Sequence, residues 1–155
     1  MLNIKNILLT TDFSKLSLTA AKYAVDLSLQ YGAKLHLLYV LEKTPPILAI
    51  HSLDLSEEKI IKTIQDEAQK SMQETVEKVK KEAGNNKIDI EYAIKKGIDY
   101  QEITKYAEIN KIDVIVIATH GTTGILHTLL GSVAEKVIRY SKCPVLVITP
   151  TEKES

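Results

Sequence analysis

The chain has 155 residues, which suits one domain, and its 45% apolar and 26% charged residues supply a core and a soluble surface. Lys plus Arg number 20 and Asp plus Glu number 20, so the charge balance gives no electrostatic reason to expect nucleic acid or an anionic membrane as a partner. No run approaches the roughly 18 apolar residues of a membrane span, and residues 1–5 lack the layout of a signal peptide. Cys143 is the single cysteine, which excludes an internal disulfide. We therefore expect a cytoplasmic protein.

Five aliphatic runs are predicted as strands, at residues 4–10, 35–40, 88–94, 114–118 and 145–148. The third run alternates apolar and polar residues, which indicates a half-exposed strand at the edge of a sheet. The fourth run, from Val114 to Ala118, is continuously apolar, as expected of a central parallel strand that is buried on both faces.

Apolar residues at helical spacing separate these strands. The first helix has Ser14 as its predicted N-cap and Gly32 as its predicted stop. A long second helix has one apolar face that runs from Ile61 to Ala83, and it is expected to end at Gly84.

Two later helices have capping signals at their predicted starts. Asp99 and Glu102 are spaced as the N-cap and N3 residues of a short third helix. Ser132 and Glu135 form the S-x-x-E pattern of a capping box ahead of the last helix.

Strands that alternate with helices predict an α/β protein with an open parallel sheet, right-handed crossovers and helices on both faces. An edge position for the third strand and a central one for the fourth favour the strand order 3-2-1-4-5. This order puts a topological switch point between the first and fourth strands, where ligands usually bind beyond the carboxyl ends. One domain is expected over residues 1–150, with a polar tail at 151–155. The apolar loop at 43–55 is a candidate lid at the same edge.

A cluster of glycines follows the fourth strand. Gly121, Gly124 and Gly131 fall within eleven residues, and threonines and Ser132 lie among and after them. Glycine lets backbone N–H groups approach an anion, and a helix that opens at Ser132 favours phosphate through its free N–H groups and dipole. The pattern describes a phosphate cradle; the alternative is a flexible loop with an ordinary helix cap.

The segments "ATHGTTGILHTLLGSVAEKVI" and "CPVLVI" resemble the C-terminal signature of the universal stress protein family. The resemblance extends to "KNILLTTDFS" and "KIDVIVIATHG" and so covers most of the chain. The nucleotide-binding branch of that family has the motif G-x2-G-x9-G-[ST]. Here Gly121 and the pair Gly131-Ser132 match it, and Ala118 replaces the first glycine, which adds one methyl group near the ribose or phosphates.

The resemblance implies a Rossmann-like fold that binds ATP or another adenine nucleotide, together with Mg²⁺. It implies that Asp12 contacts the nucleotide near adenine or ribose and that Val40 contacts adenine. From the residues alone, the alternatives are that Asp12 caps the first helix together with Ser14 and that Val40 is a core residue. The predicted nucleotide-binding residues are Thr10, Asp12, Val40, Ile117, Ala118, His120, Gly121, Thr122, Gly131, Ser132 and Val133.

No catalytic residue is predicted, because the sequence shows no nucleophile–base pair, no paired carboxylates and no Gly-Lys of a P-loop. No metal site is predicted either, because the four histidines, at 36, 51, 120 and 127, are scattered. Cys143 is expected to be a buried packing residue. The favoured function is a nucleotide-binding stress-response or signalling protein, with slow ATP hydrolysis at most. The alternatives are an interaction module without nucleotide, or an enzyme on a related ATP-binding fold, whose HIGH-like and SGGxDS-like motifs are absent.

The fifth predicted strand suggests a homodimer. Pro144 has no N–H group, so it belongs at the start of an edge strand. The following residues, Val145 to Ile148, are apolar on both faces and lack the charges that normally protect an edge. We expect this strand to pair antiparallel with its copy in a second chain, as the resembling family does.

Overall fold

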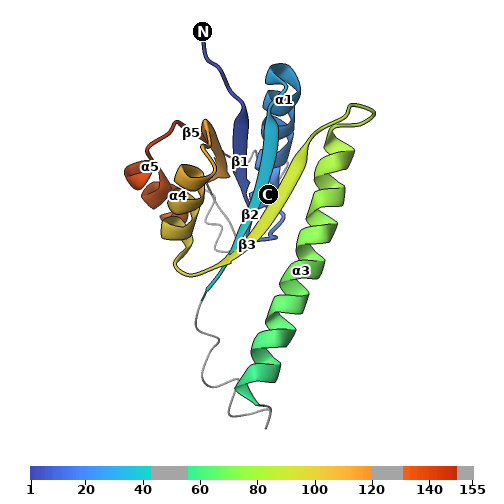
Figure 1. Ribbon diagram of the computed structural model, residues 1–155, viewed down its shortest axis with the longest axis vertical. Coiled ribbons are helices and arrows are strands. Elements are labelled where there is room, and N and C mark those ends of the chain that lie inside the picture. The colour runs from blue at the N-terminus through green and yellow to red at the C-terminus, as the bar shows by residue number, and fades with distance from the viewer. Residues whose placement is uncertain (43–55, 120–130, 150–155) are drawn as a thin grey trace.

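The computed structural model describes residues 1–42, 56–119 and 131–149 as an open sheet with helices on both faces. Its five parallel strands have the order β3-β2-β1-β4-β5, which confirms the predicted order (Figure 1). The strands are β1 (Asn6–Thr10), β2 (Lys34–Leu41), β3 (Ile90–Lys96), β4 (Val114–Ala118) and β5 (Val145–Ile148). The helices are the 3-10 turn η1 (Ser17–Ala20), α1 (Ala21–Tyr31), α3 (Glu57–Glu82), α4 (Asp99–Ile109) and α5 (Ser132–Tyr140).

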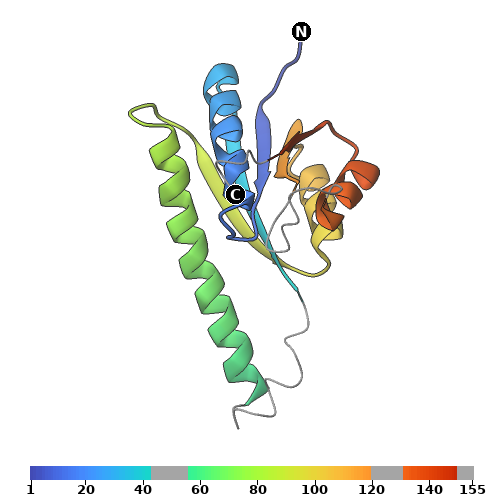
Figure 2. The same cartoon turned by 180° about the vertical axis from the view of Figure 1, so that it is seen from behind.

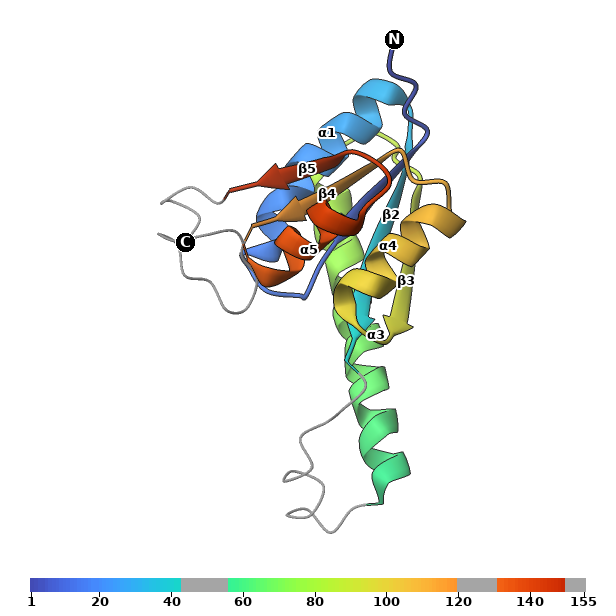
Figure 3. The same cartoon turned by 90° about the vertical axis from the view of Figure 1, so that its left-hand side faces the viewer.

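Two apolar cores lie on opposite faces of the sheet. Helices α1 and α3 cover one face and α4 and α5 cover the other (Figures 1, 2 and 3). Alternate residues of β1 serve the two faces: Ile7 and Leu9 pack with α1 and α3, whereas Leu8 packs with α4 and α5. This double burial explains why β4 is apolar at every position and why β1 is apolar from Ile7 to Leu9. We call the two sets of residues the α1/α3 core and the α4/α5 core.

Each strand bound lies within two residues of the predicted one, and β1 begins at Asn6 rather than at Ile4. β4 and β5 have the predicted ends. β3 begins two residues later than predicted, because Ile90 is the residue that pairs with Leu35 of β2. Ile88 still packs against the α1/α3 core without joining the ladder, which accounts for its place in the predicted alternation.

The predicted end of the first helix is confirmed and its predicted start is wrong. Gly32 has the left-handed φ of 63° that ends many helices, a conformation that costs glycine little. Ser14 is not the N-cap of α1, because η1 intervenes and α1 begins only at Ala21. The Ser14 hydroxyl oxygen instead accepts a hydrogen bond from the N–H of Ser17 at 3.0 Å, at the start of η1.

The capping signals of α4 and α5 are each displaced by one residue. Asp99 and Ser132 are the first helical residues, and the N-cap positions belong to Ile98 and Gly131, without a side-chain cap. The predicted capping box of α5 does not form, because the Glu135 carboxylate pairs with Arg139 one turn later, at 2.8 Å. A polar residue in the first turn satisfies helix N–H groups and the dipole much as an N-cap does, so sequence alone confuses the two positions.

A buried histidine joins β1, β2 and α4. His36 is 3% exposed, and its Nδ1 lies 2.9 Å from the Tyr106 hydroxyl, while its Nε2 lies 3.2 Å from Oδ1 of Asn6. An amide oxygen can only accept, so Nε2 donates to Asn6 and the Tyr106 hydroxyl donates to Nδ1, which is the neutral form of the imidazole. Burial lowers the pKa of His36, and the charges of Glu91, Lys34 and Asp89 modify that shift in opposite directions.

We predict a measurable contribution of His36 to stability between neutral and mildly acidic pH. The unfolded chain protonates His36 with the ordinary pKa of 6.5, whereas the folded chain holds the proton only at lower pH. The contribution of His36 to the free energy of unfolding is therefore fully present above pH 6.5. It falls as the pH drops below 6.5, by at most about 1.4 kcal/mol per pH unit for one group. Urea unfolding of the wild type and of His36→Leu, at about pH 7.5, 6.5 and 5.5, measures this slope. His36→Leu should be less stable than the wild type, and its free energy of unfolding should depend less on pH. Equal pH slopes in the two proteins would show that His36 does not cause the pH dependence.

Candidate functional site

The candidate site lies where β1 and β4 run side by side and end. These neighbouring strands are paired in register, with Ile7 beside Val114 and Leu9 beside Val116. The chain leaves β1 through η1 and α1 toward one face of the sheet, and α5 follows β4 on the other face (Figures 1 and 3). The switch point predicted from the strand order is therefore present, at the carboxyl edge where parallel sheets bind ligands.

Backbone hydrogen bonds hold the start of α5 beside the end of β4. The Thr119 N–H donates to the carbonyl of Ile148 at 2.9 Å, which continues the pairing of β4 with β5. The Thr119 carbonyl then accepts from the Gly131 N–H at 2.8 Å. The first turn of an α-helix leaves N–H groups without intrahelical partners, so those of Ser132 and Val133 are presented at this edge. The expected phosphate contact of the Gly131 N–H is not supported, because Thr119 already accepts that hydrogen bond.

Gly131 matters because it has no side chain, and not because its backbone conformation is restricted to glycine. Its φ of −56° and ψ of 149° are accessible to any residue. A larger residue can adopt this conformation, so a substitution here changes what occupies the space in front of α5 without straining the chain. The Ser132 side chain that follows is exposed, and its hydroxyl is accessible to a ligand.

The end of β1 carries the second polar group of the site. Thr10 is buried at 7% exposure, and Asp12 is half-buried two residues later. Oδ1 of Asp12 accepts a hydrogen bond from the N–H of Ser14 at 2.9 Å, so Asp12 closes a tight turn and does not cap α1. Asp12 also acts on Tyr39: burial is the main cause that raises the pKa of Tyr39, and the negative charges of Asp12 and Glu42 add to it.

The apolar residues predicted for the site divide between the two faces of the sheet. Ile117 belongs to the α4/α5 core, and Val40 and Val133 are half-buried against it, so these three side chains share one face. Ala118 is 8% exposed and belongs to the α1/α3 core on the other face. The methyl group that replaces the motif glycine therefore packs among core residues.

Three predicted site residues, His120, Gly121 and Thr122, lie outside the described residues, as does the candidate lid at 43–55. Within the described ranges, no group of three or more His, Cys, Asp or Glu residues could hold a metal ion. Cys143 is half-buried rather than fully buried; its Sγ lies 3.4 Å from the Ser141 hydroxyl oxygen, and it packs against the α4/α5 core.

Sequence reasoning missed the hydroxyl groups that surround Asp12. Thr11 and Ser17 are 7% and 6% exposed, and their hydroxyl oxygens lie 3.2 Å apart. The available signal was the density of Ser and Thr residues on both sides of a single aspartate at a strand end. Such residues hydrogen-bond to nearby backbone in turns as readily as they cap helices.

The fold and the switch point define an open α/β protein with a ligand-binding edge between β1 and β4. The model of the universal stress protein family matches residues 3–149, and the chain belongs to that family. Universal stress protein MJ0531 of Methanocaldococcus jannaschii is 37% identical over 150 residues, which cover 97% of this chain and 85% of that protein. These matches confirm the resemblance that the sequence motifs indicated.

Solved structures show the same fold. The structure of MJ0577, a universal stress protein of the same organism, has a TM-score of 0.80 at 28% identity and covers 97% of this chain and 99% of its own. A universal stress protein in complex with cAMP has a TM-score of 0.68 at 24% identity, with 97% and 100% covered. The universal stress protein of Archaeoglobus fulgidus in complex with dAMP has a TM-score of 0.61 at 19% identity, with 96% and 99% covered.

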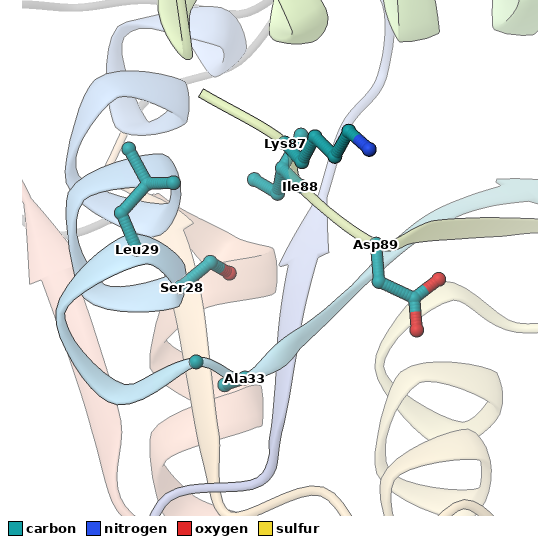
Figure 4. Close-up of a pocket in the computed structure, with 7 residues that line it drawn as sticks. Ser28, Leu29, Ala33, Lys87, Ile88 and Asp89 are labelled. Atoms are coloured by element: carbon teal, nitrogen blue, oxygen red, sulfur yellow. The ribbon is translucent and has the colours of Figure 1, made fainter.

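A separate depression lies at the opposite end of the sheet, where β2 and β3 begin (Figure 4). It is lined by Ser28, Leu29, Gly32, Ala33, Lys87, Ile88 and Asp89. Ser28 is a residue of α1 whose side chain points toward the segment that leads into β3, and it is 2% exposed. Its Oγ has no hydrogen-bond partner among the described residues. An unpaired buried hydroxyl costs stability, so this position is a structural weakness rather than part of the candidate site.

We predict that Ser28→Ala leaves the free energy of unfolding unchanged or raises it by up to about 1 kcal/mol, because no hydrogen bond is lost. Thr75→Val is a matched comparison, since Thr75 is a 3% exposed helical residue whose hydroxyl donates to the Ser71 carbonyl at 2.8 Å. That variant should lose about 1 kcal/mol. Urea unfolding measures both; an equal loss in the two variants would contradict the assignment of Ser28 as unpaired.

Proposed function

We propose that this protein binds an adenine nucleotide, with ATP as the expected ligand, across the switch point between β1 and β4. The observation that carries the proposal is the start of α5, which the bond from the Gly131 N–H to the Thr119 carbonyl holds beside the end of β4. A helix N-terminus fixed at the carboxyl edge of a parallel sheet offers N–H donors and a favourable dipole to a phosphate group. In this proposal one domain, over residues 1–150, serves as a cytoplasmic stress-response or signalling protein.

The phosphate end of the nucleotide belongs at α5. The N–H groups of Ser132 and Val133 and the exposed hydroxyl of Ser132 are the donors there. Gly131 keeps the approach open because it has no side chain. His120, Gly121 and Thr122 are proposed to contribute further contacts to the phosphates, as the family motif implies.

The nucleoside end belongs at β1 and β2. The Asp12 carboxylate is an acceptor for ribose hydroxyls or for the amino group of adenine, and Thr10 lies beside it at the strand end. Val40 supplies an apolar contact for the base, and Ile117 lines the ribose side from the same face of the sheet. Because the two ends of the nucleotide meet different elements, each end can be tested separately.

Two relatives support an adenine nucleotide as the ligand class, since universal stress proteins have been solved in complex with cAMP and with dAMP. The family resemblance also implies Mg²⁺, for which this structure suggests no separate protein site. The described residues offer no cluster of three metal ligands. Mg²⁺ usually keeps several waters and is held through substrate phosphates, so it would enter with ATP rather than occupy a site of its own.

The competing candidate is a dimeric interaction module of the same fold that holds no nucleotide. The single sequence feature in its favour was Ala118 in place of a motif glycine. The Ala118 methyl group packs in the α1/α3 core at 8% exposure, which weakens that argument. An enzymatic role has less support, because no nucleophile–base pair is assigned to the site.

We also propose that the protein is a homodimer through β5. This strand is last in the sheet order and is paired with β4 on one side. Leu146 is 37% exposed, whereas Val145 and Val147 are half-buried against the α4/α5 core. Pairing with a second copy of β5 would satisfy the backbone groups of this edge and cover Leu146.

The nucleotide proposal predicts that Gly131→Val lowers ATP affinity at least about tenfold, or about 1.4 kcal/mol, because a branched side chain fills the space in front of α5. Adenosine affinity should change little, since adenosine lacks the phosphates. The observed φ and ψ of Gly131 are accessible to valine, so the fold should survive. Calorimetric titration of wild type and variant with both ligands measures the difference, and thermal unfolding checks the fold. Absence of ATP binding by the wild type at millimolar concentration would favour the interaction module.

The dimer proposal predicts that Val147→Lys yields monomers in sedimentation velocity, because a charge on the edge strand opposes pairing. Val147 is half-buried, so Leu146→Lys provides a second variant at a more exposed position. Both variants should sediment as folded monomers, and the wild type as a dimer at micromolar concentration. A monomeric wild type would refute the proposal.

A further inference from the structure

The turn between β1 and η1 contains a chain of hydrogen bonds between hydroxyl groups. Thr11 Oγ1 accepts from the N–H of Phe13 at 2.9 Å and lies 3.2 Å from Ser17 Oγ. Ser17 Oγ donates to the Ser14 carbonyl at 2.9 Å. Since a serine hydroxyl has one hydrogen, Thr11 must be the donor in its contact with Ser17. The chain therefore runs in one direction, from Phe13 through Thr11 and Ser17 to Ser14.

Asp12 takes part in this network through both its backbone N–H group and its side-chain carboxylate. The Asp12 N–H donates to Ser17 Oγ at 3.4 Å, and Asp12 Oδ1 accepts from the Ser14 N–H at 2.9 Å. The Ser14 hydroxyl accepts in turn from the Ser17 N–H at 3.0 Å. Both the backbone and the carboxylate of Asp12 are thus connected to Ser17, either directly or through Ser14.

The turn also holds Phe13 in a conformation that bulky residues avoid. Phe13 has a φ of 67°, in the left-handed region that normally favours glycine. Two interactions of Phe13 support that conformation. Its N–H group donates a hydrogen bond to Thr11, and its ring packs on the Tyr39 ring with the two centroids 4.2 Å apart. Strained backbone persists only where the surrounding structure maintains it, and it concentrates at functional sites. The network therefore maintains one particular turn at the end of β1, with the carboxylate of Asp12 oriented by it.

We propose that Thr11 and Ser17 are positioning residues, which hold the Asp12 carboxylate in the orientation that binds the nucleoside end of the nucleotide. The inference rests on the proposed function and adds to it the residues that prepare the site before a ligand arrives. Ser17 is the more informative of the two, because its hydroxyl meets the Thr11 side chain, the Asp12 N–H and the Ser14 carbonyl. Its removal frees the turn, so that Asp12 must be ordered at the moment of binding.

Ser17→Ala should weaken the binding of ATP and of adenosine by the same factor, about fivefold, which corresponds to one ordinary hydrogen bond. Inorganic tripolyphosphate should bind to the variant as it does to the wild type, because its contacts lie at α5. Calorimetric titration with these three ligands measures the pattern. Thr19→Val is the matched control: Thr19 is in the same 3-10 turn, and its hydroxyl donates to the Leu16 carbonyl at 2.7 Å, outside the hydrogen bonds that join Thr11, Ser14 and Ser17. Its affinities should equal those of the wild type.

A double-mutant comparison separates positioning from general damage. In an Asp12→Ala background, Ser17→Ala should have no further effect on adenosine affinity, since the group that it positions is gone. The inference would be overturned if Ser17→Ala weakened tripolyphosphate as strongly as adenosine, or if its effect persisted without Asp12. Full adenosine affinity in either Ser17→Ala or Asp12→Ala would overturn it too, while the proposed nucleotide site would stand. A wild type that binds neither ATP nor adenosine would overturn both.

Discussion

The site depends on one constraint: the chain leaves the paired strands β1 and β4 toward opposite faces of the sheet. β1 is hydrogen-bonded to β2 and to β4, and its Ile7, Leu8 and Leu9 are fully buried. Such a strand can only continue past its carboxyl end, toward one face or the other. The segment after β1 joins the α1/α3 side, and α5 returns on the other side. The polar groups at the two strand ends are therefore brought together by the topology of a sheet whose middle is apolar.

The sequence predicted the sheet well, because burial on both faces leaves a distinct pattern. Val114–Ala118 could hardly be anything other than a central strand, and it has the predicted bounds. The start of β3 was misplaced because Ile88 packs on the core without pairing with β2. Helix starts were misplaced by one or more residues for a different reason. Ser, Thr and Asp stabilise a helix from several positions of its first turn, so the residue type does not fix the register.

The site was predictable in outline and not in its internal contacts. Strand order predicted the edge, and the capping pattern placed the start of α5 within one residue, whereas the role of Asp12 came only from the family resemblance. The use of the Gly131 N–H by Thr119 depends on how α5 sits over β4, which no local pattern specifies. The left-handed Phe13 and the link between Thr11 and Ser17 are similarly products of tertiary packing. In the proposed site, a carboxylate that these contacts orient would lose less entropy when its ligand arrives.

The most direct test of this account is the location of bound nucleotide on the sheet. Amide proton–nitrogen correlation spectra of the labelled protein, recorded with and without ATP, would report it residue by residue. The account predicts shift changes at Asp12, at Thr119 and from Ser132 to Ala134, where the two halves of the site meet. The amides around Ser28, at the opposite end of the sheet, should remain unchanged. Shift changes centred on Ser28, or none at all at millimolar ATP, would contradict a nucleotide site between β1 and β4.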